Sequence, residues 1–193
     1  GLNDVVIEIG ITPNRQDCLG VFGIARDLAA SGLGKLKIRK NSSQKGSFKS
    51  PIDIETKNTD LCPIFAGRYF KGVKNVQSPD WLQQKLKSVG LRPISALVDI
   101  TNFVMMEYGQ PLHAFDRELL SGNKIIIRKA KKQELFTSLD GSELKLGPDA
   151  LVIADTEKPV ALAGIMGGVN SQVSDGTQNL VLESAYFDSV AIR

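Results

Sequence analysis

The only histidine of the chain, His113, is the side chain best suited to exchange a proton near neutral pH. It follows a proline-marked turn, in residues 110–116, with polar residues nearby in an otherwise apolar stretch. A histidine in this position is either a hydrogen-bonded structural group or part of a ligand site, and both interpretations stay open. A Ser-His-Asp triad also stays open, although no nucleophile-elbow sequence is present. One histidine and two isolated cysteines match no zinc spacing, so we expect no metal.

Two further polar residues, Thr101 and Asn102, lie within an apolar stretch of helix-like composition. Both are mediocre helix formers, and if they are buried they must find hydrogen-bond partners. Thr101 could bond back to the preceding turn and Asn102 could bond within the core. Alternatively, the pair orients a ligand.

Small residues are concentrated in residues 161–168, which include Ala163 and Gly164. Small residues allow a ligand or a neighbouring backbone to approach closely, and glycines leave amide groups free to bind anions or carbonyls. The segment lacks the Gly-Lys-Ser/Thr ending of a phosphate-binding loop and is not a dinucleotide fingerprint. From the residues alone, a tight turn between two strands is the favoured interpretation.

Glu183 is an acid within the apolar residues 180–187. In a strand it lies on the face opposite Leu182, and it is either solvated or buried with a partner. A buried carboxyl group could recognise a hydroxyl or an amine.

The first half of the chain must position these residues with both helices and strands. We expect strands at 5–9, 51–56 and 65–73, a turn at 12–15, and a helix over 19–30 with Asp17 as N-cap and Gly32 as its stop. Ser78, Pro79 and Asp80 predict the start of a second helix that ends at Gly90. Residues 93–95 open a third helix that runs to Tyr108 and ends at Gly109. Its apolar composition predicts that it is buried.

The second half is β-rich, with short strands expected at 125–127, 135–137, 151–153, 160–162 and 180–182. Asp140-Gly141 is a hairpin signal. The predicted fold class is therefore α+β, with mixed and antiparallel sheets in a sandwich-like core and flanking helices.

Length and composition favour one compact domain at 1–193, with two intertwined lobes as a variant of it. Residues 35–50 are expected to form a basic surface loop, and the basic run 128–132 to form a charged sheet edge or to face phosphates. The net charge of +3 neither demonstrates nor excludes a nucleic-acid partner.

No apolar run could span a membrane, and Cys18 and Cys62 are far apart without a secretory segment. We therefore expect a cytosolic protein with reduced thiols, although a disulfide stays open.

The chain begins at Gly1 rather than methionine, and residues 189–193 read as a helix start. We therefore expect a piece excised from a longer protein.

Taken together, four stretches resemble the tRNA-editing B3/B4 domain of the bacterial phenylalanyl-tRNA synthetase β subunit. They occur in the order of that family with matching gaps, whereas residues 35–50 carry none of the resemblance. The stretches are residues 11–18, residues 92–102, residues 110–116, and residues 161–168 followed by 182–185.

The resemblance implies hydrolysis of tyrosine that has been mischarged onto phenylalanine tRNA, in a parent enzyme that ligates phenylalanine to this tRNA. It implies a pocket lined by Thr101, Asn102, Pro111, His113, Ala163, Gly164 and Glu183. In such a pocket Glu183, the Gly164 amide and Asn102 would read the tyrosine hydroxyl, while His113 and Thr101 would lie near the ribose and the ester.

The implied partners are the 3′ end of phenylalanine tRNA, the synthetase α subunit and the remaining β-subunit domains, with no membrane. No cofactor is implied in this domain, because the parent enzyme uses ATP and Mg²⁺ elsewhere. Two alternatives are a non-catalytic tRNA-binding or scaffold module and a domain that binds aromatic amino acids.

Overall fold

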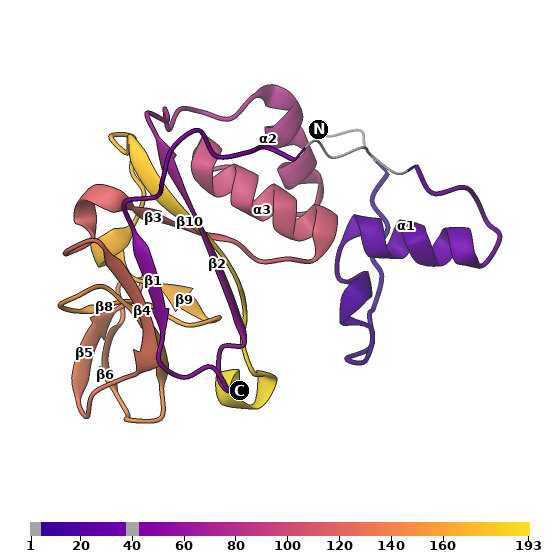
Figure 1. Cartoon of the computed structure of the whole chain (residues 1–193). Coiled ribbons are helices and arrows are strands. Elements are labelled where there is room, and N and C mark those ends of the chain that lie inside the picture. The colour runs from indigo at the N-terminus through magenta and orange to yellow at the C-terminus, as the bar shows by residue number, and fades with distance from the viewer. Residues whose placement is uncertain (1–4, 38–42) are drawn as a thin grey trace. The chain divides into compact units, whose positions relative to one another are not determined.

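The computed structural model describes residues 5–37 and 43–193 (Figure 1). Its contacts divide the chain into two compact units, each built from two segments of the sequence. The first comprises residues 1–49 and 77–112, and the second comprises residues 50–76 and 113–193. No helix among the described residues is long and apolar enough to cross a bilayer.

The first unit is helical. Its elements are η1 (Gln16–Cys18), α1 (Val21–Ala30), α2 (Asp80–Ser88) and α3 (Ala96–Tyr108). Trp81 of α2 and Phe103 of α3 meet edge to face, with ring centroids 5.6 Å apart. Gly109 ends α3 in the left-handed conformation, φ 71°, as the sequence predicts.

The helix starts differ from the predicted caps. Asp17 lies in η1 and does not cap α1, whose N-cap is Gly20. Ser78 does not cap α2 either, because its hydroxyl donates to the buried carboxylate of Asp99. The predicted burial of α3 is also wrong, since Asp99 is its only buried residue among those described.

The second unit is a β-structure with short helices. Its strands are β1 (Asp53–Thr56), β2 (Ile64–Lys71), β3 (His113–Asp116), β4 (Lys124–Lys129), β5 (Glu134–Thr137), β6 (Glu143–Leu146), β7 (Leu151–Ala154), β8 (Pro159–Leu162), β9 (Met166–Gly167) and β10 (Asn179–Tyr186). The helical turns are η2 (Arg117–Leu119), η3 (Val169–Ser171) and α4 (Ser189–Ile192). The strands form sheets in the orders β1-β4-β7-β8-β9, β2-β10-β3 and β5-β6, with only β1 and β4 parallel among these pairs.

The core of this unit lies between the five-stranded and the three-stranded sheet. Phe115 and Val181 of the three-stranded sheet share one buried cluster with Ile127 and Ile153 of the five-stranded sheet. A second cluster covers the opposite face of the five-stranded sheet, where Phe136 of the β5–β6 hairpin packs with strand β7. The predicted α+β class with a sandwich-like core is confirmed.

Several element predictions are wrong. Residues 5–9 form no strand. The short strands β3, β6 and β9 were not predicted from the sequence. In the basic run, Arg128 and Lys129 pair with β7 alone, because the register of β1 with β4 ends at Ile127. Arg128 there binds Glu134 through two hydrogen bonds, of 2.8 and 2.7 Å, with both side chains largely buried. Of the basic loop, residues 35–37 and 43–50 are irregular and largely exposed, and 38–42 lie outside the described residues.

We predict that Ile127→Ala lowers the free energy of unfolding by about 2–5 kcal/mol, because it removes a fully buried side chain between the two sheets. The matched control is Leu135→Ala, at a position that is 70% exposed, where the change should stay within about 0.5 kcal/mol. Urea unfolding of both variants measures the difference. Equal effects would contradict the assignment of the core.

Candidate functional site

Glu183 lies on the core-facing side of the three-stranded sheet. It is the middle residue of a cross-strand row, with His113 of β3 on one side and Gly67 of β2 on the other. Residues two positions along each strand, Phe115, Tyr69 and Val181, share this face and pack into the apolar core. Glu183 itself is only 8% exposed, so its carboxyl group lies in a largely apolar environment.

The imidazole of His113 is fixed by packing. It meets the ring of Phe115 edge to face, with ring centroids 4.6 Å apart. Its other side lies against Gly167 of β9, where an added Cβ would stand 2.4 Å from Cε1. Among the described residues, nothing forms a hydrogen bond with the buried Nε2 atom, which is unusual for a buried polar atom.

Burial sets the protonation of both groups. Desolvation raises the pKa of Glu183 to about 8 and lowers the pKa of His113 to about 4. At pH 7 the carboxyl group is therefore mainly protonated and the imidazole is neutral. Burial, and secondarily the charge of Glu183, raises the pKa of the Cys62 thiol to about 11. The site thus consists of uncharged polar groups at neutral pH.

Ala163 and Gly164 lie in the turn between β8 and β9, as the turn interpretation predicts. Ala163 is fully buried in the core cluster that also contains Cys62, Phe115 and Val181. Gly164 has a left-handed φ of 68°, and the side chains of Phe187 and Ile192 lie close to where a Cβ would be. The turn therefore places one small residue inside the sandwich core and a second on its surface.

Three predicted residues belong to the first unit. The Thr101 hydroxyl donates to the carbonyl of Val98 at 2.7 Å, which is the back-bond considered from the sequence. Asn102 is half-buried on α3, and Pro111 is exposed. The structure brings His113 and Glu183 together within the second unit, whereas the grouping of Thr101, Asn102 and Pro111 with them stays a prediction.

Sequence reasoning missed Gly67 and Cys62 as neighbours of the pair, and it singled out Gly167 only as part of the small-residue run 161–168. Gly67 interrupts an apolar strand, which is a signal of close packing. The structure shows this packing, since an added Cβ would lie 2.4 Å from Ile54 Cδ1. No sequence signal identifies the position of Cys62, which depends on tertiary packing.

A surface hollow of about 360 Å³ is lined by residues 72–76 and 175–178. It contains none of the seven predicted site residues. Its lining residues lie in two loops, apart from the buried pair.

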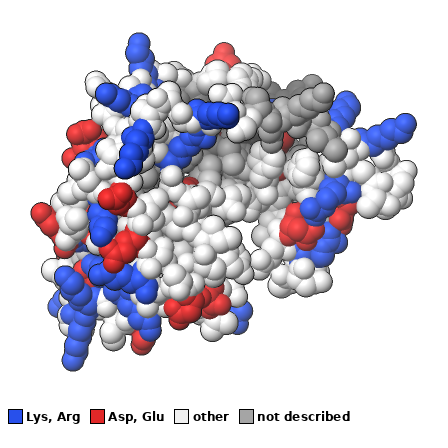
Figure 2. Space-filling view, in the orientation of Figure 1, with Lys and Arg blue, Asp and Glu red and all other residues white. Residues whose placement is uncertain are grey.

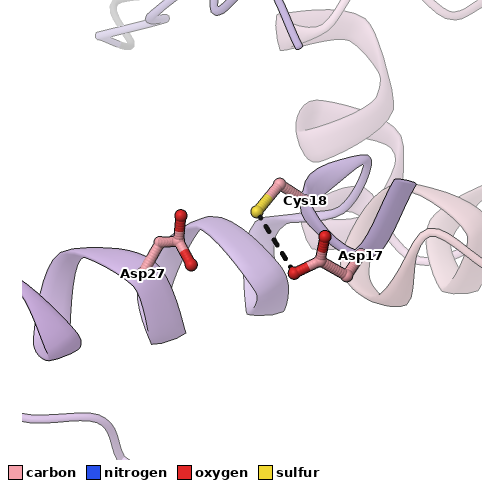
Figure 3. A group of neighbouring side chains, drawn as sticks. All are labelled: Asp17, Cys18 and Asp27. Atoms are coloured by element: carbon pink, nitrogen blue, oxygen red, sulfur yellow. Dashed lines mark hydrogen bonds between the residues drawn. The ribbon is translucent and has the colours of Figure 1, made fainter. Parts of the chain in front are cut away.

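Asp17, Cys18 and Asp27 are close enough together to hold a metal ion (Figure 3). The guanidinium of Arg15 already supplies positive charge there, with Nη2 2.6 Å from Asp27 Oδ1 and 2.9 Å from Cys18 Sγ. Arg26 also pairs with Asp17. Because a metal would have to displace Arg15, these residues fit a cation poorly, and the expectation that the domain holds no metal stays a prediction. Cys18 and Cys62 are both free thiols.

The charged groups on the surface are mixed in sign. Acidic groups lie among the basic ones on the face shown in Figure 2. In the basic run, Arg128 and Lys129 pair with Glu134 and Asp149. These pairs reduce the positive charge that the run could present to phosphates.

The comparisons with known proteins agree on one family. The sequence pattern of the B3/4 domain matches residues 61–193. The phenylalanine–tRNA ligase β subunit of Carboxydothermus hydrogenoformans is 46% identical over 192 residues, covering 100% of this chain and 24% of that protein. That of Novosphingobium aromaticivorans is 52% identical over 185 residues, covering 96% and 23%. The chain thus spans about a quarter of the length of these relatives.

Among solved structures, the chain is similar in fold to an N-terminal fragment of the phenylalanyl-tRNA synthetase β subunit from Pyrococcus horikoshii. The TM-score is 0.50 at 16% identity, covering 92% of this chain and 54% of that one. At this identity the likeness concerns the fold alone.

We predict that Glu183 makes stability fall as pH rises from about 4.5 to 8. The unfolded chain loses this proton near its ordinary pKa of 4.5, whereas the folded chain keeps it to about 8. Relative to Glu183→Gln, the wild type should therefore lose up to about 1.4 kcal/mol per pH unit in this window. Urea unfolding at several pH values measures the difference. Parallel pH curves for the two proteins would show that the carboxyl group is not desolvated.

Proposed function

The chain belongs to the B3/4 domain family, and from this premise we propose that it is the editing domain of a phenylalanine–tRNA ligase β subunit. In this role it hydrolyses the ester of tyrosine mischarged onto phenylalanine tRNA. Water adds to the ester carbonyl carbon, the bond to the ribose oxygen breaks, and that oxygen takes up a proton. The products are tyrosine and uncharged tRNA.

One observation carries the proposal: the carboxyl group of Glu183 is buried on the apolar inner face of a β-sandwich, where desolvation raises its pKa to about 8. A protonated carboxyl group both donates and accepts a hydrogen bond, as a phenol hydroxyl does. Tyrosine would pair with it, whereas phenylalanine would leave a buried polar group unpaired, at a cost of about 1–3 kcal/mol. Sites that hydrogen-bond a substrate hydroxyl reject the analogue lacking it by large factors.

His113 is proposed to orient the terminal ribose or the attacking water. Its pKa of about 4 makes it a weak base at neutral pH, far from the value that suits general-base catalysis. Its unpartnered Nε2 can still bind a hydroxyl or a water molecule. Because an aminoacyl ester is already activated, a positioned water is sufficient for the reaction.

The other predicted residues are proposed to complete the pocket. Ala163 limits its size, since a larger side chain in this fully buried position would fill the space for a ring. The Gly164 amide and Asn102 are proposed to help bind the tyrosine hydroxyl. Thr101 and Pro111 are proposed to line the end of the pocket near the ribose.

The parent enzyme is proposed to ligate phenylalanine to its tRNA in the cytoplasm, using ATP and Mg²⁺ outside this domain. The proposed partners are the 3′ end of phenylalanine tRNA, the α subunit and the remaining β-subunit domains. The matched relatives, which are about four times as long as this chain, support this placement.

We predict that Glu183→Ala abolishes the preference for the tyrosyl ester in the assembled αβ enzyme, because the variant cannot bind the phenol hydroxyl. Rates of deacylation are measured on matched Tyr- and Phe-charged tRNA. The control Glu183→Gln keeps a neutral donor and acceptor of similar size and should retain part of the preference. If Glu183→Ala discriminates as well as the wild type, the hydroxyl-reading role is wrong.

The same assay separates the alternatives. A scaffold module produces no turnover of either ester. A sensor of aromatic amino acids binds free tyrosine without turnover. Editing requires hydrolysis of the tyrosyl ester at a rate that exceeds the spontaneous rate.

We predict that His113→Ala hydrolyses Tyr-charged tRNA within a few-fold of the wild-type rate, because the neutral imidazole positions a group and does not accept a proton in the rate-limiting step. The wild-type rate should also show no imidazole titration step between pH 5.5 and 8, since the pKa is about 4. A loss of roughly a hundredfold or more, the range in which general acid–base groups contribute, would identify His113 as an essential base.

A further inference from the structure

The turn between β8 and β9, which carries Ala163 and Gly164, is backed by residues 187–192. An added Cβ at Gly164 would stand 3.1 Å from Phe187 Cδ2 and 3.2 Å from Ile192 Cδ1. Both distances are shorter than ordinary van der Waals contact, so these two side chains fill the space beside the glycine. Gly164 also has a left-handed φ of 68°, a conformation that glycine adopts without strain.

Phe187 connects the two parts of the proposed pocket. It follows strand β10, four residues after Glu183, and its ring packs against the buried cluster that contains Ala163 and Val181. The same ring lies against the Gly164 turn. The position of Gly164 relative to Glu183 is therefore determined by a side chain at the end of the strand that carries Glu183.

Ile192 approaches the same glycine from α4, and this short helix is anchored to the second unit. The carboxylate of Asp188 caps it by accepting hydrogen bonds from the amides of Val190 and Ala191, at 3.1 and 2.9 Å. The Asp188 amide donates to the carbonyl of Leu61 at 2.9 Å. Ile192 is half-buried, whereas Val190 of the same helix is 77% exposed. Only one side of α4 therefore packs on the domain.

The turn itself has limited means to keep its shape. Its backbone hydrogen bonds run from the Ala163 amide to the carbonyl of Leu151, at 3.0 Å, and from the Ile165 amide to the carbonyl of Leu162, at 3.1 Å. Gly164, between them, has the widest choice of backbone conformations of any residue. Packing by neighbouring side chains is what restricts that choice.

We propose that Phe187 and Ile192 are positioning residues for the editing pocket. They hold the Gly164 turn at the spacing from Glu183 that accommodates a phenol ring and its hydroxyl. Both side chains are hydrocarbon, so they act through the turn and transfer no proton. This inference rests on the proposed editing function and adds the element that maintains the selectivity of its pocket.

A matched pair of variants in the assembled αβ enzyme tests the role. Ile192→Ala removes the contact with Gly164, whereas Val190→Ala removes an exposed side chain from the same helix. We expect Ile192→Ala to raise the KM for Tyr-charged tRNA by about tenfold or more, because small misplacements in a site are costly. The kcat should stay within a few-fold, and deacylation of Phe-charged tRNA should not change. Val190→Ala should behave as the wild type.

A milder variant covers the case in which Ile192→Ala unfolds the subunit. Ile192→Val removes only Cδ1, the atom of Ile192 nearest to the added Cβ, and should lower the preference for the tyrosyl ester in the same direction by a smaller factor. Equal losses with both esters would indicate a general structural role and would overturn the proposal. Equal effects of the Ile192 and Val190 substitutions would overturn it too.

Hydrogen exchange gives a readout that is independent of deacylation. The amides of Gly164 and Ile165 should exchange about tenfold faster in Ile192→Ala than in the wild type or Val190→Ala, because the turn opens more often. Unchanged exchange would overturn the proposal. If the wild type shows no preference for the tyrosyl ester, the editing proposal fails and the positioning role fails with it. A full preference retained in Ile192→Ala would instead overturn the positioning role alone.

Discussion

Desolvation of the Glu183 carboxyl group is the constraint on which the rest of the site depends. The group lies on the inner face of a β-sandwich with apolar neighbours, and this burial raises its pKa to about 8. A protonated carboxyl group can remain in such a place at neutral pH, whereas an ionised one would require a paired charge. The same burial explains the neutral imidazole of His113. Packing has therefore converted two titratable residues into uncharged hydrogen-bonding groups.

The sheet register makes this burial possible. Strand β10 pairs with β2 and β3 and so aligns Gly67, Glu183 and His113, which are far apart in the sequence, in one row. The glycines are required by packing, because Ile54 fills the space beside Gly67 and the imidazole fills the space beside Gly167. Gly167, on β9 of the five-stranded sheet, thus leaves room for the imidazole, and Gly67 leaves room for Ile54 beside the row. Rigid strands also hold these groups more precisely than loops could.

Local sequence signals, such as helix-stop glycines and apolar runs, predicted much of the fold but less of the candidate site. Gly90 and Gly109 ended their helices as expected, and the apolar runs of the second half became strands. The predicted helix caps were wrong where a tertiary hydrogen bond competed. The Ser78 hydroxyl donates to the buried carboxylate of Asp99 and so does not cap its own helix. Strand β3 could not be predicted because its four residues gain strand structure only by pairing with β10. The burial of Glu183 likewise depends on which face of the sheet is covered by other elements. The sequence does not determine which face this is.

The two parts of the chain also differ in how fully they bury their apolar residues. In the second unit, the inner faces of both sheets and the outer face of β7 are covered by its own residues. In residues 5–33 the side chains of Arg15, Asp17 and Asp27 are paired, whereas several large apolar side chains, such as Val21, Leu28 and Leu33, are exposed. Ion pairs among exposed side chains add little stability, so the network around Arg15 cannot replace an apolar core.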